Sequence, residues 1–322
     1  KSAWRPVAAA AAACILLCWT VYRFDVSPAR TPPNRSFLFL DHLLGMTGWA
    51  HDTAYRILEL PLPMAALFRG VGETFVFGRE GHPAYLFGAV SQHGWWYFFP
   101  VVLAVKTPLA FAALAVIGAV AAICARVLTV VECLAAAAAI LLVSMAAHIN
   151  IGVRHILPIY LFLAPAAGFA AVHLWQRSRA AAVVLCAWML AGSVAAHPHY
   201  LADFNLLAGR EPERIVVDSD LDWGQDLRFA TEALRARGAR EAWLVVTVTP
   251  AQRRQTGVTY RSLPKGMPVR GWVAASVRSI RFENAWARAT GQPEPYGWLK
   301  GVQPVARAGR SILIYDLSGA GP

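Results

Sequence analysis

Apolar residues along this chain are gathered into five long runs, and polar residues fill the intervals between them. A helix needs about 20 consecutive apolar residues to cross the hydrocarbon core of a bilayer. The pattern therefore predicts five spanning helices, the second extended backwards through residues 101–105 and the fourth containing two prolines, which membrane helices tolerate. The five runs cover residues 7–22, 109–125, 129–147, 156–175 and 180–196.

The intervals predict the parts outside the membrane. Residues 23–94 are a long outer loop rich in Pro and Gly, with surface helices expected at 36–50 and at 53–71, the latter broken by prolines. After His197 the periodicity changes, and a helix is expected over 225–237. Strands are expected at 214–217, 243–249, 271–276 and 311–315, which together indicate a small α/β domain.

The composition agrees with this architecture. Of 322 residues, 57% are hydrophobic and only 15% are charged, and the mean hydropathy is +0.44, which is too apolar for a soluble protein of this length. The five cysteines lie in apolar runs without metal-ligand company and are interpreted as small hydrophobic residues. We expect an α-helical polytopic membrane protein over residues 1–197, followed by an extramembrane α/β domain over 198–322.

The basic residues predict an orientation. The net charge is +11, and the arginines flank apolar runs or lie in loops, which favours anionic lipid or a phosphate-bearing substrate over nucleic acid as a partner. The short loops that carry positive charge all fall on one side, which the positive-inside rule makes cytoplasmic. Residues 23–94, 148–155 and everything after 197 are then outside, and Arg154 is an exception to the bias. The residues that set the orientation are Lys1, Arg5, Arg126, Arg177 and Arg179.

Two stretches at the outer ends of the helices carry candidate chemistry. Residues 95–108 begin with aromatic side chains, including Trp95 and Trp96, which are typical of a membrane interface, and end near Lys106. Residues 148–160 hold Arg154 and His155, and a guanidinium there can clamp a phosphate bidentately. Both Lys106 and Arg154 also fit the ordinary alternative, a cation that anchors a helix end by extending to water.

Two further stretches follow the last span. His199 and Tyr200 lie in residues 197–205, where His197, His199 and Asp203 allow a metal site but more simply form an interfacial turn lining the site. Residues 218–226 hold four aspartates that begin like an EF-hand, but Trp223 takes the glycine position. Two interpretations of this stretch remain open. Asp222 caps the following helix, or Asp220 and Asp222 contact hydroxyl groups of an acceptor.

The loop before the aromatic stretch is dense in polar groups, among them His93, and is either a binding loop or a solvated surface. The pairs Asp41–His42 and His51–Asp52 place a carboxylate beside an imidazole, as proton transfer requires. Glycine-rich phosphate loops, a serine nucleophile elbow and nucleic-acid motifs are absent from the sequence.

Four motifs in this order resemble the bacterial membrane glycosyltransferases of family 39, relatives of the dolichyl-phosphate-mannose–protein mannosyltransferases. They are PAYLFGAVSQHGWWYFFPVVLAVKTPL (83–109), NIGVRHILPIY (150–160), HPHYLADFN (197–205) and DSDLDWGQDL (218–227), and GWVAASV and GRSILIYDL near the end are similar too. The resemblance covers most of the chain from Pro61 onward. It implies a GT-C architecture in a bacterial plasma membrane, with the C-terminal domain outside.

The resemblance implies an activity as well. Such enzymes transfer a sugar from a polyprenyl-phosphate donor to a protein or lipid acceptor, and the reaction calls for no cofactor. Lys106, Arg154 and His155 are then placed to bind the donor phosphate, while His93, Trp95, Trp96, His199, Tyr200, Asp220 and Asp222 are candidates for the sugar or acceptor.

The family's usual catalytic carboxylates lie in a first outer loop that matches no stretch here, so the chain is expected to be a C-terminal part, and no catalytic base is assigned. It also begins at Lys1, and its first run could alternatively be a signal peptide. A second possibility is a non-catalytic membrane subunit or binding module with an outer partner-binding domain. A transporter is disfavoured because paired broken helices and internal repeats are absent from the sequence pattern.

Overall fold

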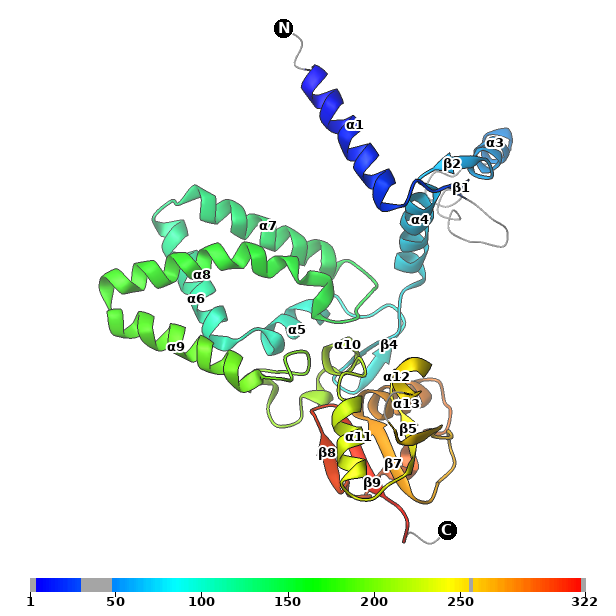
Figure 1. Ribbon diagram of the computed structural model, residues 1–322. Coiled ribbons are helices and arrows are strands. Elements are labelled where there is room, and N and C mark those ends of the chain that lie inside the picture. Colours follow the sequence, from blue (N-terminus) through cyan, green and yellow to red (C-terminus); the bar gives the residue numbers. More distant parts are fainter. Residues whose placement is uncertain (1–3, 30–47, 255–256, 320–322) are drawn as a thin grey trace. The chain divides into compact units, whose positions relative to one another are not determined.

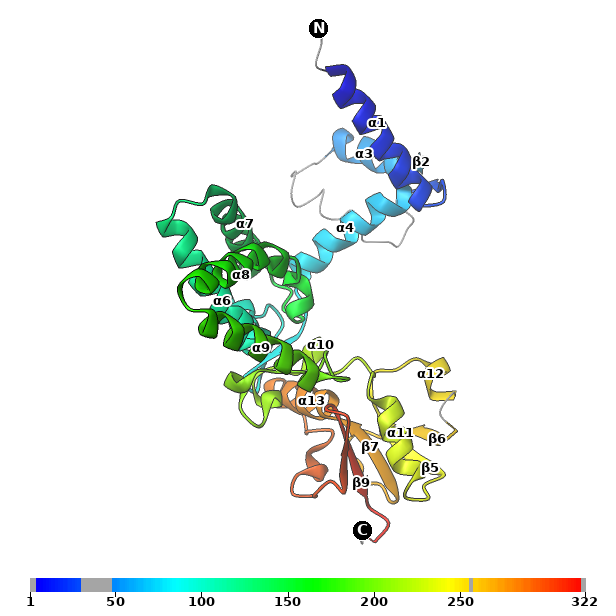
Figure 2. The same ribbon diagram turned by 60° about the vertical axis from the view of Figure 1, so that its left-hand side comes forward.

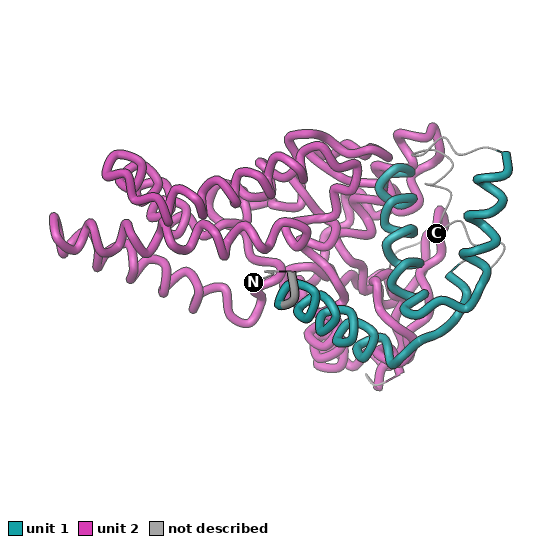
Figure 3. The backbone as a smooth tube through the Cα atoms, turned by 90° about the horizontal axis from the view of Figure 1, so that it is seen from above, with its two compact units in different colours: residues 1–81 teal, residues 82–322 magenta. Residues whose placement is uncertain are grey.

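The computed structural model describes residues 4–29, 48–254 and 257–319, and the chain divides into two compact units, Lys1–Gly81 and His82–Pro322 (Figures 1 and 3). This division follows contacts within each unit. The expected boundary at residue 197, which separates membrane from outer domain, stays a prediction.

The first unit is built around a short strand pair. Its helices and strands are α1 (Trp4–Val21), β1 (Val26–Pro28), α3 (Trp49–Leu58), β2 (Pro61–Pro63) and α4 (Ala65–Glu80). The strands β1 and β2 pair antiparallel, and Tyr55 and Ala65 are buried beside them. The break expected within 53–71 is confirmed, because the prolines form β2, with α3 ending before it at Leu58 and α4 beginning after it at Ala65. Most of the helix expected at 36–50, and the Asp41–His42 pair, lie outside the described residues.

The second unit contains a bundle of apolar helices. They are α5 (Phe98–Lys106), α6 (Leu109–Cys124), α7 (Leu128–Met145), α8 (Pro158–Arg177) and α9 (Arg179–Ala196). Helix α8 packs against α6, α7 and α9 (Figures 1 and 2). Among the described residues, α7, α8 and α9 are long and apolar enough to cross a membrane, and α5 with α6 meets the same test as a bent pair. The unit thus has three or four candidate spans.

The backward extension of the second span is wrong. Helix α5 is separate from α6, and the two are bent by 112°. Thr107 is extended because the ring of Pro108 disfavours the helical conformation in the residue before it. The side-chain amide of Asn205 donates to the carbonyls of Ala104 and Thr107 at 2.6 and 2.7 Å, which satisfies acceptors exposed by the break.

Small residues allow two of the helices to approach closely. A Cβ on Gly118 of α6 would lie 1.8 Å from the carbonyl oxygen of Ala166 in α8. Close approach through small residues is the usual basis of helix packing in a bilayer, where the hydrophobic effect does not drive association. Large apolar side chains on the outer faces, such as Leu142 and Leu161, remain exposed.

The last part of the second unit is a five-stranded sheet in the order β6-β5-β7-β9-β8. β6 and β7 are parallel to β5, and β9 is antiparallel to both of its neighbours, β7 and β8. Helix α11 covers one face and α13 lies on the other. The strands are β5 (Glu241–Val245), β6 (Thr259–Ser262), β7 (Trp272–Ser276), β8 (Ala306–Ala308) and β9 (Ile312–Asp316), with α11 (Leu227–Arg235) and α13 (Val277–Ala289).

The expectations for this domain are largely confirmed. The strands near 243–249, 271–276 and 311–315 and the helix within 225–237 are present. The strand at 214–217 is wrong: the segment begins in a 3-10 turn, and Val216 and Val217 are buried against other elements. The remaining elements are β3 (Ala84–Leu86), β4 (Ala89–Ser91), α10 (Asp218–Leu221), α12 (Pro250–Arg254) and the 3-10 helices η1 (Val153–Ile156), η2 (Leu206–Ala208), η3 (Pro212–Arg214) and η4 (Gly297–Leu299).

Candidate functional site

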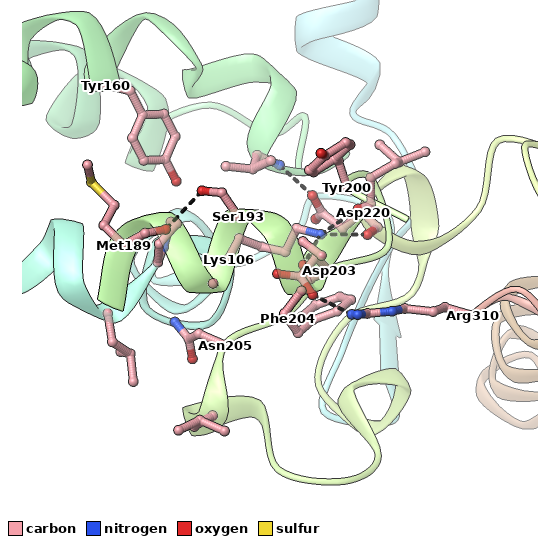
Figure 4. A pocket seen from close by; sticks show the side chains of 18 of the residues that line it. Lys106, Tyr160, Met189, Ser193, Tyr200, Asp203, Phe204, Asn205, Asp220 and Arg310 are labelled. Carbon is pink, nitrogen blue, oxygen red and sulfur yellow. Dashed lines mark hydrogen bonds and ion pairs between the residues drawn. The ribbon is translucent and has the colours of Figure 1, made fainter. Parts of the chain in front are cut away.

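A cavity of about 760 Å³ opens where the helix bundle meets the C-terminal domain. Four of the predicted site residues line it, namely Lys106, Arg154, Tyr200 and Asp220. Figure 4 shows the polar side chains gathered at one side, with Met189 and Ser193 of α9 and Tyr160 of α8 along the other. The apolar wall comes from Pro108, Leu109, Ala110, Leu157, Trp188 and Met189. The cavity is therefore polar at one end and apolar along the helices.

Lys106 is tied to the backbone around it. Its Nζ donates to the carbonyls of Leu201, Asp203 and Asp220 at 2.6, 2.8 and 2.9 Å, and lies 4.1 Å from the centre of the Phe204 ring. An ammonium group has three protons, so all of its donors are used. Lys106 can thus contribute charge to the cavity, while its hydrogen bonds hold α5, the 201–203 turn and α10 together.

Arg154 differs from Lys106. It is exposed, and its guanidinium lies 4.6 Å from the centre of the Trp223 ring. Among the described residues this guanidinium makes no hydrogen bond and no ion pair. Stacking on an aromatic face leaves the planar donors of an arginine free at their edges. Arg154 is therefore the cation of this cavity whose donors are available to an anion.

Asp220 is the buried acid beside these cations. It is 2% exposed, and its Oδ1 accepts a hydrogen bond from the backbone N–H of Val153 at 2.9 Å. Its Oδ2 has no partner among the described residues. Burial raises the pKa of this carboxyl, and the charges of Lys106 and Arg154 lower it in part. Asp220 therefore links α10 to η1, directly beside Arg154.

A glycine makes the contact between Asp220 and η1 possible. Gly152 has φ +107°, and a Cβ there would lie 2.6 Å from the hydroxyl of Ser219 and 2.9 Å from both carboxylate oxygens of Asp220. A side chain at this position would be strained and would also displace the carboxylate. Residues 151–155 can therefore pack directly against α10.

Two further polar contacts join segments of the cavity wall. The guanidinium of Arg310 forms an ion pair with the carboxylate of Asp203 (Figure 4). The hydroxyl groups of Thr107 and Tyr160 are 2.8 Å apart, joining the α5–α6 break to α8. Asp203 is therefore already paired with a cation and is not a free acid in this structure.

His155 and the aromatic stretch lie outside the set of cavity-lining residues. His155 is exposed, and burial, Arg154 and His82 lower its pKa in that order. The backbone N–H of Trp95 donates to Asn150 Oδ1 at 2.6 Å, and Trp96 is 67% exposed. The interface belt expected at 95–99 is partly wrong, because Phe98 and Phe99 are fully buried core residues. His93 instead packs edge-on against His148.

His199 and Asp222 make contacts within the C-terminal domain that follows α9. The ring of His199 packs against Phe229, and its Nδ1 lies 3.4 Å from the carboxylate of Asp226, outside hydrogen-bond geometry. Asp222 accepts hydrogen bonds from the hydroxyls of Ser276 and Ser311 and from the N–H of Gly224. Asp222 does not cap α11, so that interpretation is wrong. Groups of three or more metal-ligating side chains are absent from the described residues.

Sequence reasoning missed Trp223, Tyr160 and Arg310 as parts of the cavity. All three lie inside motifs that were noticed for other reasons, at 218–227, 150–160 and 309–317. Their position inside the motifs could have indicated a role in the site. The periodicity of the chain, however, does not show which motifs lie next to one another in the fold.

No protein-family model, no curated protein and no solved structure matches this chain. The function is therefore inferred from the geometry of the cavity and from the motifs themselves.

Proposed function

We propose that this chain is a membrane-embedded glycosyltransferase module that receives a sugar on a polyprenyl-phosphate donor and passes it to a protein or lipid acceptor. The observation that carries this proposal is the two-sided cavity. One end offers the free guanidinium of Arg154, and the apolar wall comes from residues 108–110 at the start of α6, from Leu157 before α8 and from Trp188 and Met189 of α9. A lipid with a phosphate headgroup needs both features at once.

The chemistry of transfer fits the same arrangement. When the sugar leaves, negative charge grows on the carrier phosphate, and fixed cations that stabilise it are usually the main catalytic contribution. Arg154 supplies free donors for that charge, and Lys106 adds a positive charge that its carbonyl partners hold in place. Tyr200, which is exposed in the same cavity, and Asp220 are then nearest to the sugar or acceptor.

The proposal includes a location. We propose five spans in a bacterial plasma membrane, with Arg126, Arg177 and Arg179 cytoplasmic and the C-terminal domain outside. The apolar helices support a membrane setting, because several large side chains on their outer faces are exposed to the surroundings. Figure 1 shows the connections α6–α7 and α8–α9 at the end of the bundle away from α10, and by their positions in the sequence these arginines lie in or next to the two connections.

A second candidate is a non-catalytic subunit that binds the lipid carrier. It is favoured by the state of the two carboxylates that line the cavity. Asp203 is paired with Arg310, and Asp220 is almost completely buried. A general base must reach the proton it removes, and neither acid is free to do so in this arrangement. Binding of the carrier without transfer would support this candidate over the first.

The experiment is an Arg154→Ala substitution in the membrane-embedded protein, assayed for transfer from a radiolabelled polyprenyl-phosphate sugar. We expect transfer to fall on the order of a hundredfold, because one preorganised charge-stabilising donor is lost. Arg214→Ala is the matched control, since Arg214 only forms an exposed ion pair with Glu211. Unchanged transfer by Arg154→Ala at normal expression would refute the role of Arg154 as a phosphate clamp.

A further inference from the structure

A second cavity of about 320 Å³ lies in the outer part of the second unit and shares no lining residue with the first. It is formed by the hairpin β3–β4, the turn η3, the helix α13 and the strand β9. Pockets that bind small ligands begin at about 300 Å³, so the space suits a molecule of one or two sugar rings.

The walls of this second cavity combine aromatic rings with hydrogen-bonding groups. Tyr85, Tyr296 and Tyr315 line it, and the hydroxyls of Tyr296 and Tyr315 make no hydrogen bond among the described residues. Asn284 accepts a hydrogen bond from the backbone N–H of Tyr296 at 2.9 Å, which turns its free amide NH₂ away from that contact. These groups suit a ring that bears hydroxyl groups.

A buried carboxylate strengthens this interpretation. Glu213 lines the cavity and is 6% exposed, and its Oε1 lies 3.4 Å from the guanidinium of Arg307. Its Oε2 has no partner among the described residues. A buried acceptor without a donor is costly, and a ligand hydroxyl would satisfy it.

Three cations, Arg281, Arg288 and Lys300, are among the residues that line this second cavity. Arg281 lies 3.6 Å from Glu211, beyond hydrogen-bond distance, while Arg288 and Lys300 both pair with Glu294. Arg281 and Arg288 lower the pKa of Tyr85, against the larger raising effect of its burial, so their positive potential reaches the inside. An anionic group on the ligand would therefore be stabilised near Arg281, whose donors are not used by a hydrogen bond among the described residues.

We propose that this second cavity binds an acidic sugar, a pyranose ring with a carboxylate, with ring hydroxyls toward Glu213 and Asn284 and the carboxylate toward Arg281. A singly charged carboxylate fits better than a phosphate dianion because Glu213 stands in the same cavity. The proposal does not depend on the transferase function, since it concerns binding by different residues.

The test is isothermal titration of the full chain in detergent micelles with glucuronic acid and, separately, with glucose. We expect glucuronic acid to bind at least about tenfold more tightly than glucose, and Arg281→Gln to remove that preference. A tenfold ratio of affinities corresponds to about 1.4 kcal/mol, which a charge-assisted hydrogen bond from Arg281 to the carboxylate can supply. Arg237→Gln is the matched control, because Arg237 lies on the same domain and bonds only to the carbonyl of Ala233.

Glu213→Gln should weaken glucose, because a neutral amide oxygen is a poorer acceptor for its hydroxyls than a carboxylate. If this variant fails to fold, Arg281→Gln alone carries the test because the side chain of Arg281 is 42% exposed. Equal affinity for the two sugars, no heat of binding with either, or full retention of the preference in Arg281→Gln would overturn the proposal. Loss of binding in Arg154→Gln with no effect of Arg281→Gln would overturn it as well, since the sugar would then occupy the first cavity.

Discussion

Lys106 and Arg154 look alike in the sequence, as single cations beside apolar runs, but they have different partners. The ammonium of Lys106 is enclosed by three carbonyls, and the guanidinium of Arg154 is stacked on Trp223 with its donors free. The first arrangement stabilises the fold around the cavity, and the second leaves a group available for a ligand. The two roles can be separated by substitution.

Replacing Lys106 should act mainly on stability. Lys106→Met keeps the length of the side chain but leaves three carbonyls without their donor, so we expect the free energy of unfolding to fall by about 3 kcal/mol. Thermal unfolding in detergent would measure it. Lys265→Met is the control, because Lys265 pairs with Glu283 at an exposed position and should cost about 0.5 kcal/mol or less. Equal stability of the two variants would contradict the role given to Lys106.

Asp220 predicts a pH dependence. Burial raises the pKa of its carboxyl above the ordinary value of 3.8, so the folded state binds more protons than the unfolded chain above that pH. Stability from this group is then full below about pH 3.8 and falls as the pH rises through the folded pKa. Asp220→Asn cannot ionise, and its stability relative to the unsubstituted protein should therefore increase from acidic to neutral pH.

Asp316→Asn provides the comparison of opposite sign. Hydrogen bonds from Ser318 lower the pKa of Asp316, so its contribution is present above its unfolded pKa and is lost on acidification. Its variant should lose relative stability toward neutral pH, while Asp220→Asn gains. If the unfolding temperatures of the two variants, each relative to the unsubstituted protein, change with pH in the same direction, burial does not set the pKa of Asp220.

At the scale of elements, the cavity depends on the packing of α10 against η1 and Gly152. Gly152 adopts a backbone conformation that favours glycine and leaves room for Ser219 and Asp220. Asp220 in turn binds the N–H of Val153, the first residue of η1. The position of Arg154, one residue further, is therefore set by a contact between segments almost seventy residues apart in the chain.

Gly152→Ala should disturb this contact. The added Cβ meets the hydroxyl of Ser219 at 2.6 Å, and the positive φ adds strain, so we expect a loss of about 2–4 kcal/mol in unfolding free energy. Gly168→Ala is the matched control, because Gly168 lies within α8 and a Cβ there meets nothing within 4 Å. The unfolding temperatures of the two variants test this prediction. An unchanged unfolding temperature for Gly152→Ala would contradict it and would mean that η1 tolerates a shifted Asp220.

The elements that the sequence predicts well are those with strong local periodicity. Helices α7, α8 and α9 and strands β7 and β9 lie within two residues of their expected bounds. The α5–α6 break was missed because residues 98–105 and 108–125 are both apolar and read as one run, although Pro108 marked the break. The strand expected at 214–217 was wrong because β-branched residues also suit a buried irregular segment, which only its tertiary neighbours decide.

The site is less predictable than the elements, for the same physical reason. The motifs were visible, and four of ten candidate residues line the cavity. A side chain is available to a ligand only if its donors and acceptors are not already bonded within the protein. For Lys106 this depends on hydrogen bonds to residues about a hundred positions away in the chain. Local sequence does not encode such pairings, so Arg154 could not be distinguished from Lys106 beforehand.

At the scale of the whole second unit, the apolar helices and the C-terminal domain contribute different parts of one cavity. The bundle supplies the apolar wall, and α10 and Arg310 supply much of the polar end. A lipid-linked anion is the kind of ligand that uses both. A second groove, lined by Val172, Trp175, Val183 and Cys186 of α8 and α9, is mainly apolar, and the guanidinium of Arg179 lies 5.6 Å from the centre of its Trp175 ring.

The most direct measurement is photo-crosslinking of the protein with a polyprenyl phosphate that carries a diazirine on the isoprene unit nearest the phosphate. We expect labelling at Trp188, Met189 and Leu109, which line the first cavity, and strong loss of that labelling in Arg154→Gln but not in Arg214→Gln. Labelling confined to the groove at Trp175 and Val183, or labelling unchanged by Arg154→Gln, would contradict this expectation.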